Sequence, residues 1–391
     1  MTASPNELVD LVTANVSRRI LDRRDEKREE TTMTTDTNTS FKAMLRNKQF
    51  ITAPGVFDLV SAKIADRTTA QALYMTGYGV VASFLGQPDA GLATYTDMLN
   101  RAEAIVDATH KPLIADGDTG YGGLLNVAHT VRGYEKAGVA VIQIEDQHFP
   151  KKCGHTPNRH VVPTQEMVNK IKVASDARSS ADCLILARTD ALTSLGLDAA
   201  LRRGEAYANA GADMLFIEAP ESKEQMRKIG ASFDVPVLSN QLHGGVTPIL
   251  PPNELQEMGF AAAIYPTVGL FAASHALDNV YQALAQGKPV SEPLYAFGDF
   301  VDMIGFPKVW EFEQKYADLL AQSQDEGDAV GCEETSDRYA LPGTAEDFND
   351  DRPARGGRDF GDALAATADE WCGGAGSRTS DREDFSATST R

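Results

Sequence analysis

The chain has 391 residues, of which 42% are hydrophobic and 24% are charged, as expected for a globular protein with a sizeable core. It holds 56 acidic and 37 basic residues, and the net charge of −19 argues against nucleic acid or an anionic membrane surface as its partner. No apolar run reaches the roughly 18 residues of a membrane helix, the N-terminus lacks a signal-peptide pattern, and four scattered cysteines without CxxC spacing favour a reducing, cytoplasmic setting.

Residues 1–40 are predicted to be an extension outside the folded domain. They contain a mixed charge run from Arg18 to Glu30 and a polar, low-complexity stretch from Thr31 to Ser40. Such segments cannot bury enough apolar surface to fold, so we expect this one to be disordered. Met33 is an alternative start of the protein.

Residues 41–320 show a repeated alternation of short β-branched apolar runs and helical patterns. We expect strands at 50–57, 72–77, 112–116, 139–145, 183–188, 214–218, 236–240 and 261–265. We expect helices near 97–109, 124–137, 164–178, 198–210, 221–231, 252–258 and 270–286. Eight such units predict a TIM (β/α)8 barrel. The competing fold is an open doubly wound sheet, but no GxGxxG follows the first strand.

The C-terminal part of the chain changes in texture. Phe306–Leu320 has the apolar spacing of one further helix, packed outside the barrel strands. Residues 321–391 hold 17 acidic and 7 basic residues and few aliphatic ones, so we expect a disordered acidic tail. More than half of the net charge therefore lies in this tail.

Polar residues occur at the ends of most predicted strands. Asp58, Glu145, Arg188, Glu218 and Asn240 each stand at or just after a strand end. In a TIM barrel the carboxyl ends of the strands and the loops after them form the active site. The pattern therefore predicts a site in which these side chains converge.

Asp116 and Asp118 are separated by one glycine, and Glu145 ends the next strand. Carboxylates held close together repel one another unless a cation or a proton neutralises them. Mg²⁺ suits such a site, with one or two direct oxygen ligands and the rest reached through water. The alternative is a turn in which these aspartates cap the following helix.

The loop after the fourth strand contains Lys151, Lys152, Cys153, Gly154 and His155. Its basic residues predict a lowered thiol pKa at Cys153, and its glycine allows close approach to a ligand. The alternatives are a basic surface loop, a cysteine–histidine protease, or a zinc site that adds His148 and His160, whose spacing matches no common pattern. Cys183 lies in an apolar strand and is expected in the core.

These motifs together resemble one family. The chain is similar to the isocitrate lyase and phosphoenolpyruvate mutase superfamily in Pro54–Asp58, Asp116–Gly122, Ile144–Gln147, Lys151–His155 and Ala187–Asp190, in that order along residues 41–320. The resemblance implies a TIM barrel and Mg²⁺-dependent chemistry, with Mn²⁺ as the alternative ion. The loop with Cys153 resembles the corresponding loop of the carbon–carbon lyases, whereas the phosphonate mutases carry an asparagine-containing loop there.

Within the lyases, the resemblance favours methylisocitrate lyase. Thr156–Arg159 is similar to the Pro-Asn-basic sequence of those enzymes, and Phe216 is similar to their smaller aromatic, which leaves room for one methyl group. Dimethylmalate lyase and oxaloacetate hydrolase remain the closest alternatives, and a phosphonomutase, a Schiff-base aldolase and a non-catalytic dicarboxylate binder are the others.

The resemblance assigns roles to named residues in a retro-aldol cleavage of 2-methylisocitrate to pyruvate and succinate. Asp118 is expected to bind the ion directly, and Asp116 and Glu145 mainly through water. The residues expected to bind substrate are Asp58, Thr76, Gly77, Gly154, Arg188, Phe216, Glu218 and Asn240. Cys153 is the expected general acid, tuned by Lys151, with His155 fixing a substrate oxygen and Tyr74 as a candidate base. Glu218 is also expected to orient His155 or a lysine. The loop Phe149–Val162 is expected to act as a lid, and the family resemblance implies a homotetramer with exchanged C-terminal helices.

Overall fold

The computed structural model describes residues 41–156 and 159–317. The predicted N-terminal extension, the acidic tail and the last three residues of the helix expected at Phe306–Leu320 lie outside the described residues. The described part holds the whole predicted barrel and the helices that follow it.

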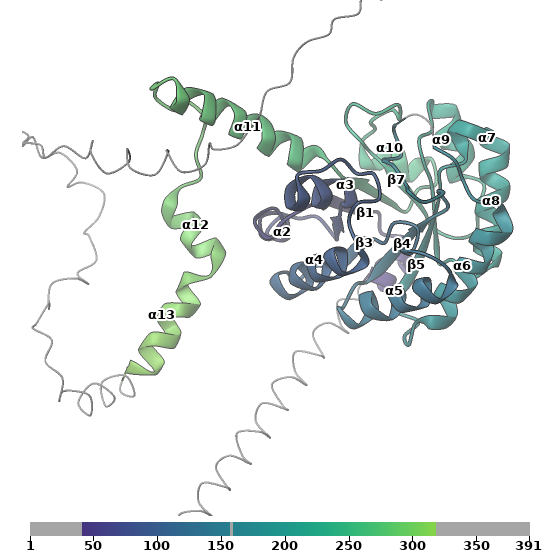
Figure 1. Ribbon diagram of the computed structural model, residues 1–391, viewed down its shortest axis with the longest axis horizontal. Helices are drawn as coiled ribbons and strands as arrows, with labels where there is room; N and C mark the ends of the chain where they lie inside the picture. Colours follow the sequence, from purple (N-terminus) through teal and green to yellow (C-terminus); the bar gives the residue numbers. More distant parts are fainter. Residues whose placement is uncertain (1–40, 157–158, 318–391) are drawn as a thin grey trace, which may run out of the picture. The chain divides into compact units, whose positions relative to one another are not determined.

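A closed barrel of eight parallel strands forms the centre of the fold (Figure 1). The strands are β1 (Ile51–Val56), β2 (Leu73–Met75), β3 (Leu113–Asp116), β4 (Val141–Glu145), β5 (Leu184–Thr189), β6 (Met214–Ile217), β7 (Val237–Asn240) and β8 (Ala262–Tyr265). Each strand pairs with its neighbours in chain order, and β8 pairs with β1 from Ile51 opposite Ala262 onwards, which closes the barrel. The predicted TIM barrel is confirmed, with every expected strand present.

Helices follow the strands at the predicted places. The longer ones are α2 (Leu59–Asp66), α4 (Tyr95–Ala108), α5 (Leu124–Lys136), α6 (Thr164–Ala177), α8 (Leu197–Asn209), α9 (Lys223–Gly230), α10 (Pro252–Glu257) and α11 (Val268–Ala285). The shorter ones are α3 (Gly77–Val80), a π-helical turn η1 (Val81–Leu85) and α7 (Leu192–Leu195). The sequence reading missed α2, which begins with a reciprocal capping box between Asp58 and Ser61.

Two helices follow α11, namely α12 (Phe297–Ile304) and α13 (Phe306–Lys315). The predicted helix begins at Phe306 as expected, and α12 was not predicted. Neither α11 nor α13 buries a single residue fully, although both carry large apolar side chains.

The hydrophobic core has two layers on either side of the strands. Tyr74, Ile114 and Phe216 belong to the cluster formed by alternate strand residues and closed by Phe41, while Met75, Val131 and Ile171 belong to the cluster between strands and helices. The strands are therefore largely apolar on both faces, and their acidic and basic residues, Asp116, Glu145 and Arg188, lie at or near the carboxyl ends. That restriction directs the ionisable side chains to one mouth of the barrel.

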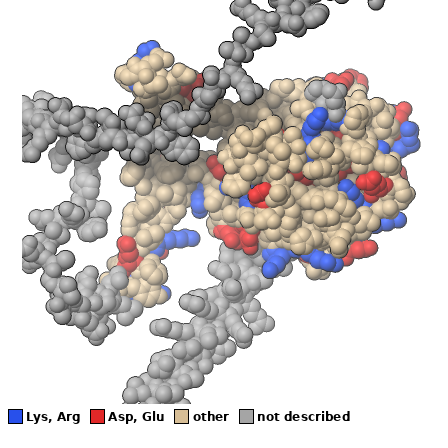
Figure 2. Space-filling view, in the orientation of Figure 1, with Lys and Arg blue, Asp and Glu red and all other residues tan. Residues whose placement is uncertain are grey.

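The described surface carries charges of both signs. On the side drawn in Figure 2, basic and acidic side chains are interspersed over the barrel, without a continuous basic patch among the described residues there. In the part of the chain that the structure describes, we find no helix with the length and apolarity needed to span a bilayer.

Candidate active site

A cavity of about 310 Å³ opens where the carboxyl ends of the strands meet the loop after β4. Its walls include most of the residues expected at the site, namely Tyr74, Thr76, Asp116, Glu145, Lys151, Cys153, Gly154, His155, Arg188, Glu218 and Asn240. Four expected residues, Asp58, Gly77, Asp118 and Phe216, do not line it. The strand ends and the Lys151–His155 loop are thus brought together as predicted.

Lys151 lies between two carboxylates rather than beside the thiol. Its Nζ is 2.7 Å from Asp118 Oδ1 and 2.7 Å from Asp89 Oδ1, and all three side chains are buried. Burial alone would lower the pKa of Lys151, but Asp118 and Asp89 outweigh it and raise that pKa well above its usual value. Lys151 is therefore a fixed cation whose charge is locally neutralised.

Asp118 was expected to bind the ion directly, and its position argues for a different role. Its carboxylate bonds Lys151 and does not reach the cavity wall, and its backbone turns with a φ of 48°. Burial raises the pKa of Asp118 to about 7, although Lys151 opposes this rise. Asp116, which does line the cavity, is the better candidate for direct contact with an ion.

Asp89 is the site residue that sequence reasoning missed. It lies in the loop between η1 and α4, lines the cavity, and accepts the Cys153 backbone N–H at its carbonyl oxygen, 3.2 Å away. No strand precedes it, so its place in the barrel gave no reason to select it. The available signal was an acidic residue within a short glycine-flanked loop, Gly86–Gly91.

The cavity carboxylates fit a divalent cation bound mostly through water. Asp116 and Glu145 both line the cavity, and Glu145 Oε1 is buried without a hydrogen-bond partner. Within the described ranges, no group of three or more His, Cys, Asp or Glu side chains is arranged to hold a metal directly. Hard oxygen donors with few direct contacts are the pattern that suits Mg²⁺. Among the described residues, Cys153, His148, His155 and His160, the set considered for zinc, do not form such a group either.

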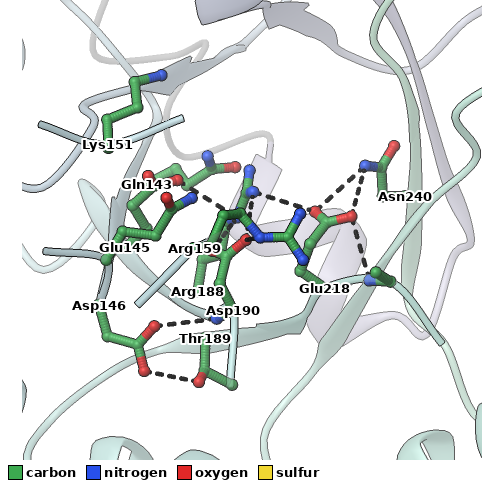
Figure 3. Close-up of polar contacts among 12 residues, drawn as sticks. Gln143, Glu145, Asp146, Lys151, Arg159, Arg188, Thr189, Asp190, Glu218 and Asn240 are labelled. Carbon is green, nitrogen blue, oxygen red and sulfur yellow. Dashed lines mark hydrogen bonds and ion pairs between the residues drawn. The ribbon is translucent and has the colours of Figure 1, made fainter. Parts of the chain in front are cut away.

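Arg188 is surrounded by carboxylates (Figure 3). Its Nε and Nη2 each donate a 2.9 Å hydrogen bond to Asp190, Nε lies 3.3 Å from Glu145 Oε2, and Nη2 lies 3.4 Å from Glu218 Oε2. The guanidinium carbon lies 5.0 Å from the ring centre of Phe216. Phe216 is fully buried beneath Arg188, so it does not form the methyl-sized gap in the cavity wall that was expected.

His155, Glu218 and Asn240 form a connected group. His155 Nε2 lies 2.6 Å from Glu218 Oε1, and Asn240 Nδ2 donates to both Glu218 oxygens at 3.2 and 3.3 Å. Burial alone would raise the pKa of Glu218, but the charge of Arg188 and the bond from His155 lower it to about 2. The predicted pairing of Glu218 with His155 is therefore present, with an ionised carboxylate orienting the imidazole.

The Cys153 thiol differs from its prediction. Burial raises its pKa above the ordinary value of 9.0, and the backbone N–H of His155 and the charge of Arg188 offset this only in part. The expected lowering of this pKa is wrong because burial outweighs the lowering effects, and Lys151 lies between Asp89 and Asp118. A partly buried thiol with a raised pKa that faces the cavity is suited to donating a proton.

Tyr74 also differs in its acid–base character. It lines the cavity and donates from its hydroxyl to Gln143 Oε1 at 3.3 Å. Burial, together with the nearby Asp116, raises its pKa well above 10. A phenol so reluctant to ionise is a hydrogen-bond donor at neutral pH, which argues against Tyr74 as the base.

Two further expected residues have structural explanations. Asp58 caps α2, since its Oδ1 accepts the Ser61 N–H at 2.7 Å, and this position lies outside the cavity. Gly77 lies against Asp116, where an added Cβ would be 2.4 Å from Oδ2. Asp58 was therefore selected for its strand-end position, whereas Gly77 serves the site by leaving room for the Asp116 carboxylate.

Comparison with known proteins agrees with this geometry. Residues 41–285 match the family model described as phosphoenolpyruvate phosphomutase. The 2,3-dimethylmalate lyase of Eubacterium barkeri is 47% identical over 285 residues, covering 72% of this chain and 99% of that protein. The 2-methylisocitrate lyase of Escherichia coli is 38% identical over 289 residues, covering 73% and 97%.

Solved structures give the same result. A crystal structure of 2,3-dimethylmalate lyase, described as a member of the PEP mutase/isocitrate lyase superfamily, matches with a TM-score of 0.68 and 36% identity over 71% of this chain and 95% of that one. Phosphonopyruvate hydrolase in complex with oxalate and Mg²⁺ matches with a TM-score of 0.65 and 28% identity, covering 72% and 99%. The chain belongs to the isocitrate lyase and phosphoenolpyruvate mutase superfamily.

Proposed function

We propose that this protein is a Mg²⁺-dependent carbon–carbon lyase that cleaves an alkyl-substituted 2-hydroxy dicarboxylate. The observation that carries the proposal is the position of Cys153, which lines the same cavity as Asp116, Glu145 and Arg188 and whose thiol pKa is raised by burial. A retro-aldol cleavage needs a proton donor for the carbanion, anchors for carboxylates and a means of stabilising the developing negative charge. One cavity supplies all three.

Each residue has a stated task in this reaction. Arg188 and Asn240 hold substrate carboxylate oxygens. His155 lines the same cavity, where Glu218 holds it through Nε2 and its Nδ1 accepts the Val246 N–H. When bound near Asp116 and Glu145, Mg²⁺ would polarise the carbonyl that forms from the substrate hydroxyl. As the carbon–carbon bond breaks, the substrate hydroxyl loses its proton to a water molecule and becomes a carbonyl, and the electron pair of the broken bond stays on the departing fragment. Cys153 donates its proton to that carbon, and solvent then reprotonates the thiolate. The loop that carries Cys153 excludes water, which would otherwise quench the carbanion.

The cavity wall supports an apolar substituent on the substrate. Leu242, Ile264, Pro266 and Phe271 line the same cavity as Arg188. A methyl or ethyl group packed there gains about 1–3 kcal/mol per carbon, whereas a carboxylate would lose its hydration. We therefore propose 2,3-dimethylmalate, cleaved to pyruvate and propionate, and the 47% identical dimethylmalate lyase supports this choice.

2-Methylisocitrate is the second candidate. His243 and Lys152 also line the cavity and would suit a third carboxylate, and the 38% identical methylisocitrate lyase supports this reading. The two sequence features that favoured 2-methylisocitrate do not gain support from the cavity. Phe216 is not part of the cavity wall, and Pro157 and Asn158 lie outside the described residues.

Product analysis separates the candidates. The purified full-length chain is incubated with Mg²⁺ and, separately, 2,3-dimethylmalate, 2-methylisocitrate, isocitrate, oxaloacetate and phosphonopyruvate. Pyruvate with propionate is the expected outcome, pyruvate with succinate would indicate 2-methylisocitrate, and oxalate with acetate would indicate a hydrolase. Conversion of phosphonopyruvate without any lyase product would overturn the proposal in favour of a mutase.

Ion binding is tested apart from turnover. Mn²⁺, a spectroscopic stand-in for Mg²⁺, is titrated into the protein and followed by electron paramagnetic resonance. We expect Asp116→Asn to weaken binding by about tenfold or more, since a ligand charge is lost. The surface variant Asp198→Asn serves as the control and should bind as the wild type does. Equal affinity in both variants would remove Asp116 from the ion site.

We also propose that the protein is a homo-oligomer, most simply a homotetramer, in which a second copy covers the C-terminal helices. Phe297 is 84% exposed and Phe312 is 64% exposed, and α11 and α13 bury no residue fully. Apolar surface of this extent marks an interaction site. Sedimentation should give a multiple of the 42.1 kDa chain mass, and a purely monomeric species would contradict the proposal.

A further inference from the structure

Gln147 follows Glu145 and Asp146 at the end of β4, and the proposed chemistry gives it no task. Its side chain is 2% exposed and forms two hydrogen bonds with the backbone of a single residue. Gln147 Nε2 donates to the Lys152 carbonyl at 2.8 Å, and its Oε1 accepts the Lys152 N–H at 3.0 Å. The amide thus satisfies both backbone groups of Lys152, as a neighbouring strand would.

Lys152, whose backbone Gln147 binds, lies between two residues of the site. On one side, Lys151 places its Nζ between Asp89 and Asp118. On the other, Cys153 faces the cavity and donates its backbone N–H to the Asp89 carbonyl at 3.2 Å. Because consecutive backbone groups share peptide planes, fixing both groups of Lys152 restricts the directions in which its neighbours project.

Gln147 is itself anchored in the barrel. Its backbone forms an isolated antiparallel bridge with Val161, and the Val162 N–H donates to the Asp146 carbonyl at 2.9 Å. Arg203 links the same two segments, since its Nη1 lies 3.0 Å from Asp146 Oδ2 and its Nη2 donates to the Val162 carbonyl at 2.9 Å. The backbone of Gln147 is therefore held in place, and its side-chain amide in turn restrains the segment Lys151–Cys153 through Lys152.

We propose that Gln147 is a positioning residue that holds the segment Lys151–Cys153 closed over the cavity. The inference rests on the proposed function only in taking Cys153 as the proton donor. Without the amide, the segment loses two partly buried hydrogen bonds and opens more often. Cys153 then spends more time accessible to solvent and less time at the reacting carbon.

Two substitutions separate the amide's contribution from that of its bulk. Gln147→Met keeps the length of the side chain and removes both hydrogen bonds. Gln147→Glu keeps the size and one acceptor but places a second oxygen against the Lys152 carbonyl, which repels it. If Gln147→Met fails to fold, the isosteric Gln147→Glu decides the question.

The readout is the rate at which iodoacetamide alkylates Cys153 in the full-length protein without substrate. Mass-spectrometric peptide mapping assigns the product to Cys153 and separates it from the fully buried Cys183 and from Cys332 and Cys372. Loss of two partly buried hydrogen bonds predicts an increase of about tenfold or more in this rate for both variants.

Gln71 provides a matched control at the opposite ends of the strands. Its Oε1 accepts the Thr52 N–H at 3.0 Å, and its Nε2 donates to the Thr69 carbonyl at 2.9 Å. Gln71→Met likewise removes one accepted and one donated hydrogen bond to the backbone, here near the starts of β1 and β2. It should lower thermal stability but leave the alkylation rate of Cys153 unchanged.

The outcomes distinguish this inference from the proposed function. Wild-type alkylation in both Gln147 variants, or equal acceleration in Gln71→Met, would overturn the positioning role, whatever the substrate. If the wild type cleaves none of the candidate substrates, the lyase proposal fails while the alkylation result still decides the role of Gln147. With an active wild type, the Gln147 variants should lose kcat about tenfold with a smaller change in KM.

Discussion

Arg188 donates two hydrogen bonds of 2.9 Å to the carboxylate of Asp190, two residues further along the chain. This bidentate pair is buried and uses the Nε edge of the guanidinium. An incoming substrate carboxylate therefore meets an arginine whose orientation is already fixed. Asp190 decides which edge of Arg188 remains available, although it does not line the cavity itself.

We expect Asp190→Asn to weaken substrate binding by about tenfold or more. A hydrogen bond between charged groups contributes about 1.5–3 kcal/mol, and its loss lets the Arg188 side chain reorient. Steady-state kinetics should show a raised KM with a smaller change in kcat. The pair Arg178–Asp213, away from the cavity, provides the control. Asp213→Asn should lower stability and leave KM unchanged, and an equal rise in KM in both variants would argue against a specific role for Asp190.

Cys153→Ser should lower kcat by about a hundredfold or more, because a positioned general acid contributes a factor of 10²–10⁴. A serine hydroxyl is a far weaker acid than a thiol, so the proton transfer slows while carboxylate binding persists. KM should change little. The matched control is Cys183→Ala. Cys183 is buried directly before β5, so this variant should retain kcat while losing stability. Full activity in Cys153→Ser would remove Cys153 from the role of acid.

The pKa of Glu218, lowered to about 2 from 4.5, makes stability depend on pH. A lowered folded-state pKa stabilises the protein above the unfolded value near pH 4.5, and this contribution disappears as the pH falls towards 2. We therefore expect Glu218→Gln to be less stable than the wild type at pH 7, with a gap that narrows by pH 3. Urea unfolding at both pH values measures it. Glu103→Gln on α4 controls for the loss of one carboxylate, and a constant gap would show that Glu218 is not the titrating group.

Asp58→Ala tests the reassignment of that residue from the substrate site to a helix cap. Loss of an N-cap costs about 1 kcal/mol, and Asp58→Asn should recover most of it. Urea unfolding should show this loss while kcat stays within about twofold of the wild type, since the carboxylate bonds Ser61. A large fall in activity with unchanged stability would restore Asp58 to the substrate site.

Leu242→Ala tests the apolar part of the cavity. The truncation removes contacts to an alkyl substituent, and each lost methylene contact lowers kcat/KM for 2,3-dimethylmalate by a factor of roughly ten. Inhibition by oxalate, which has no alkyl group, should be unaffected and serves as the control. Equal weakening of both ligands would indicate a general distortion of the cavity.

The fold could be predicted almost completely from the sequence. Strands of a buried parallel sheet appear as short, nearly continuous apolar runs, such as Leu184–Thr189, and this pattern is typical of such sheets. The strand ends gave Asp116, Glu145, Arg188 and Asn240, since the barrel directs them to one mouth. The same rule also selected Asp58, which caps α2 and does not line the cavity. A strand end can also be a helix start, and the Asp58/Ser61 capping pattern was the competing signal.

Two properties of the site could not be predicted from residue order. Asp89 reaches the cavity from a loop, and its contact with Lys151 joins residues 62 positions apart. The thiol pKa of Cys153 also depends on the fold, because burial raises it and the charge of the nearby Asp89 raises it further. Electrostatic effects follow distances in space, and spacing along the chain gives those distances only within one element.

The ion pairs of the cavity have a consequence for the order in which ligands bind. Lys151 contacts two carboxylates and Arg188 contacts three, so acidic groups outnumber the cations that face them. A dianionic substrate approaching this mouth alone would meet repulsion, whereas a divalent cation would be attracted. If the proposed lyase activity is correct, we expect the divalent cation to bind before the dianionic substrate or together with it.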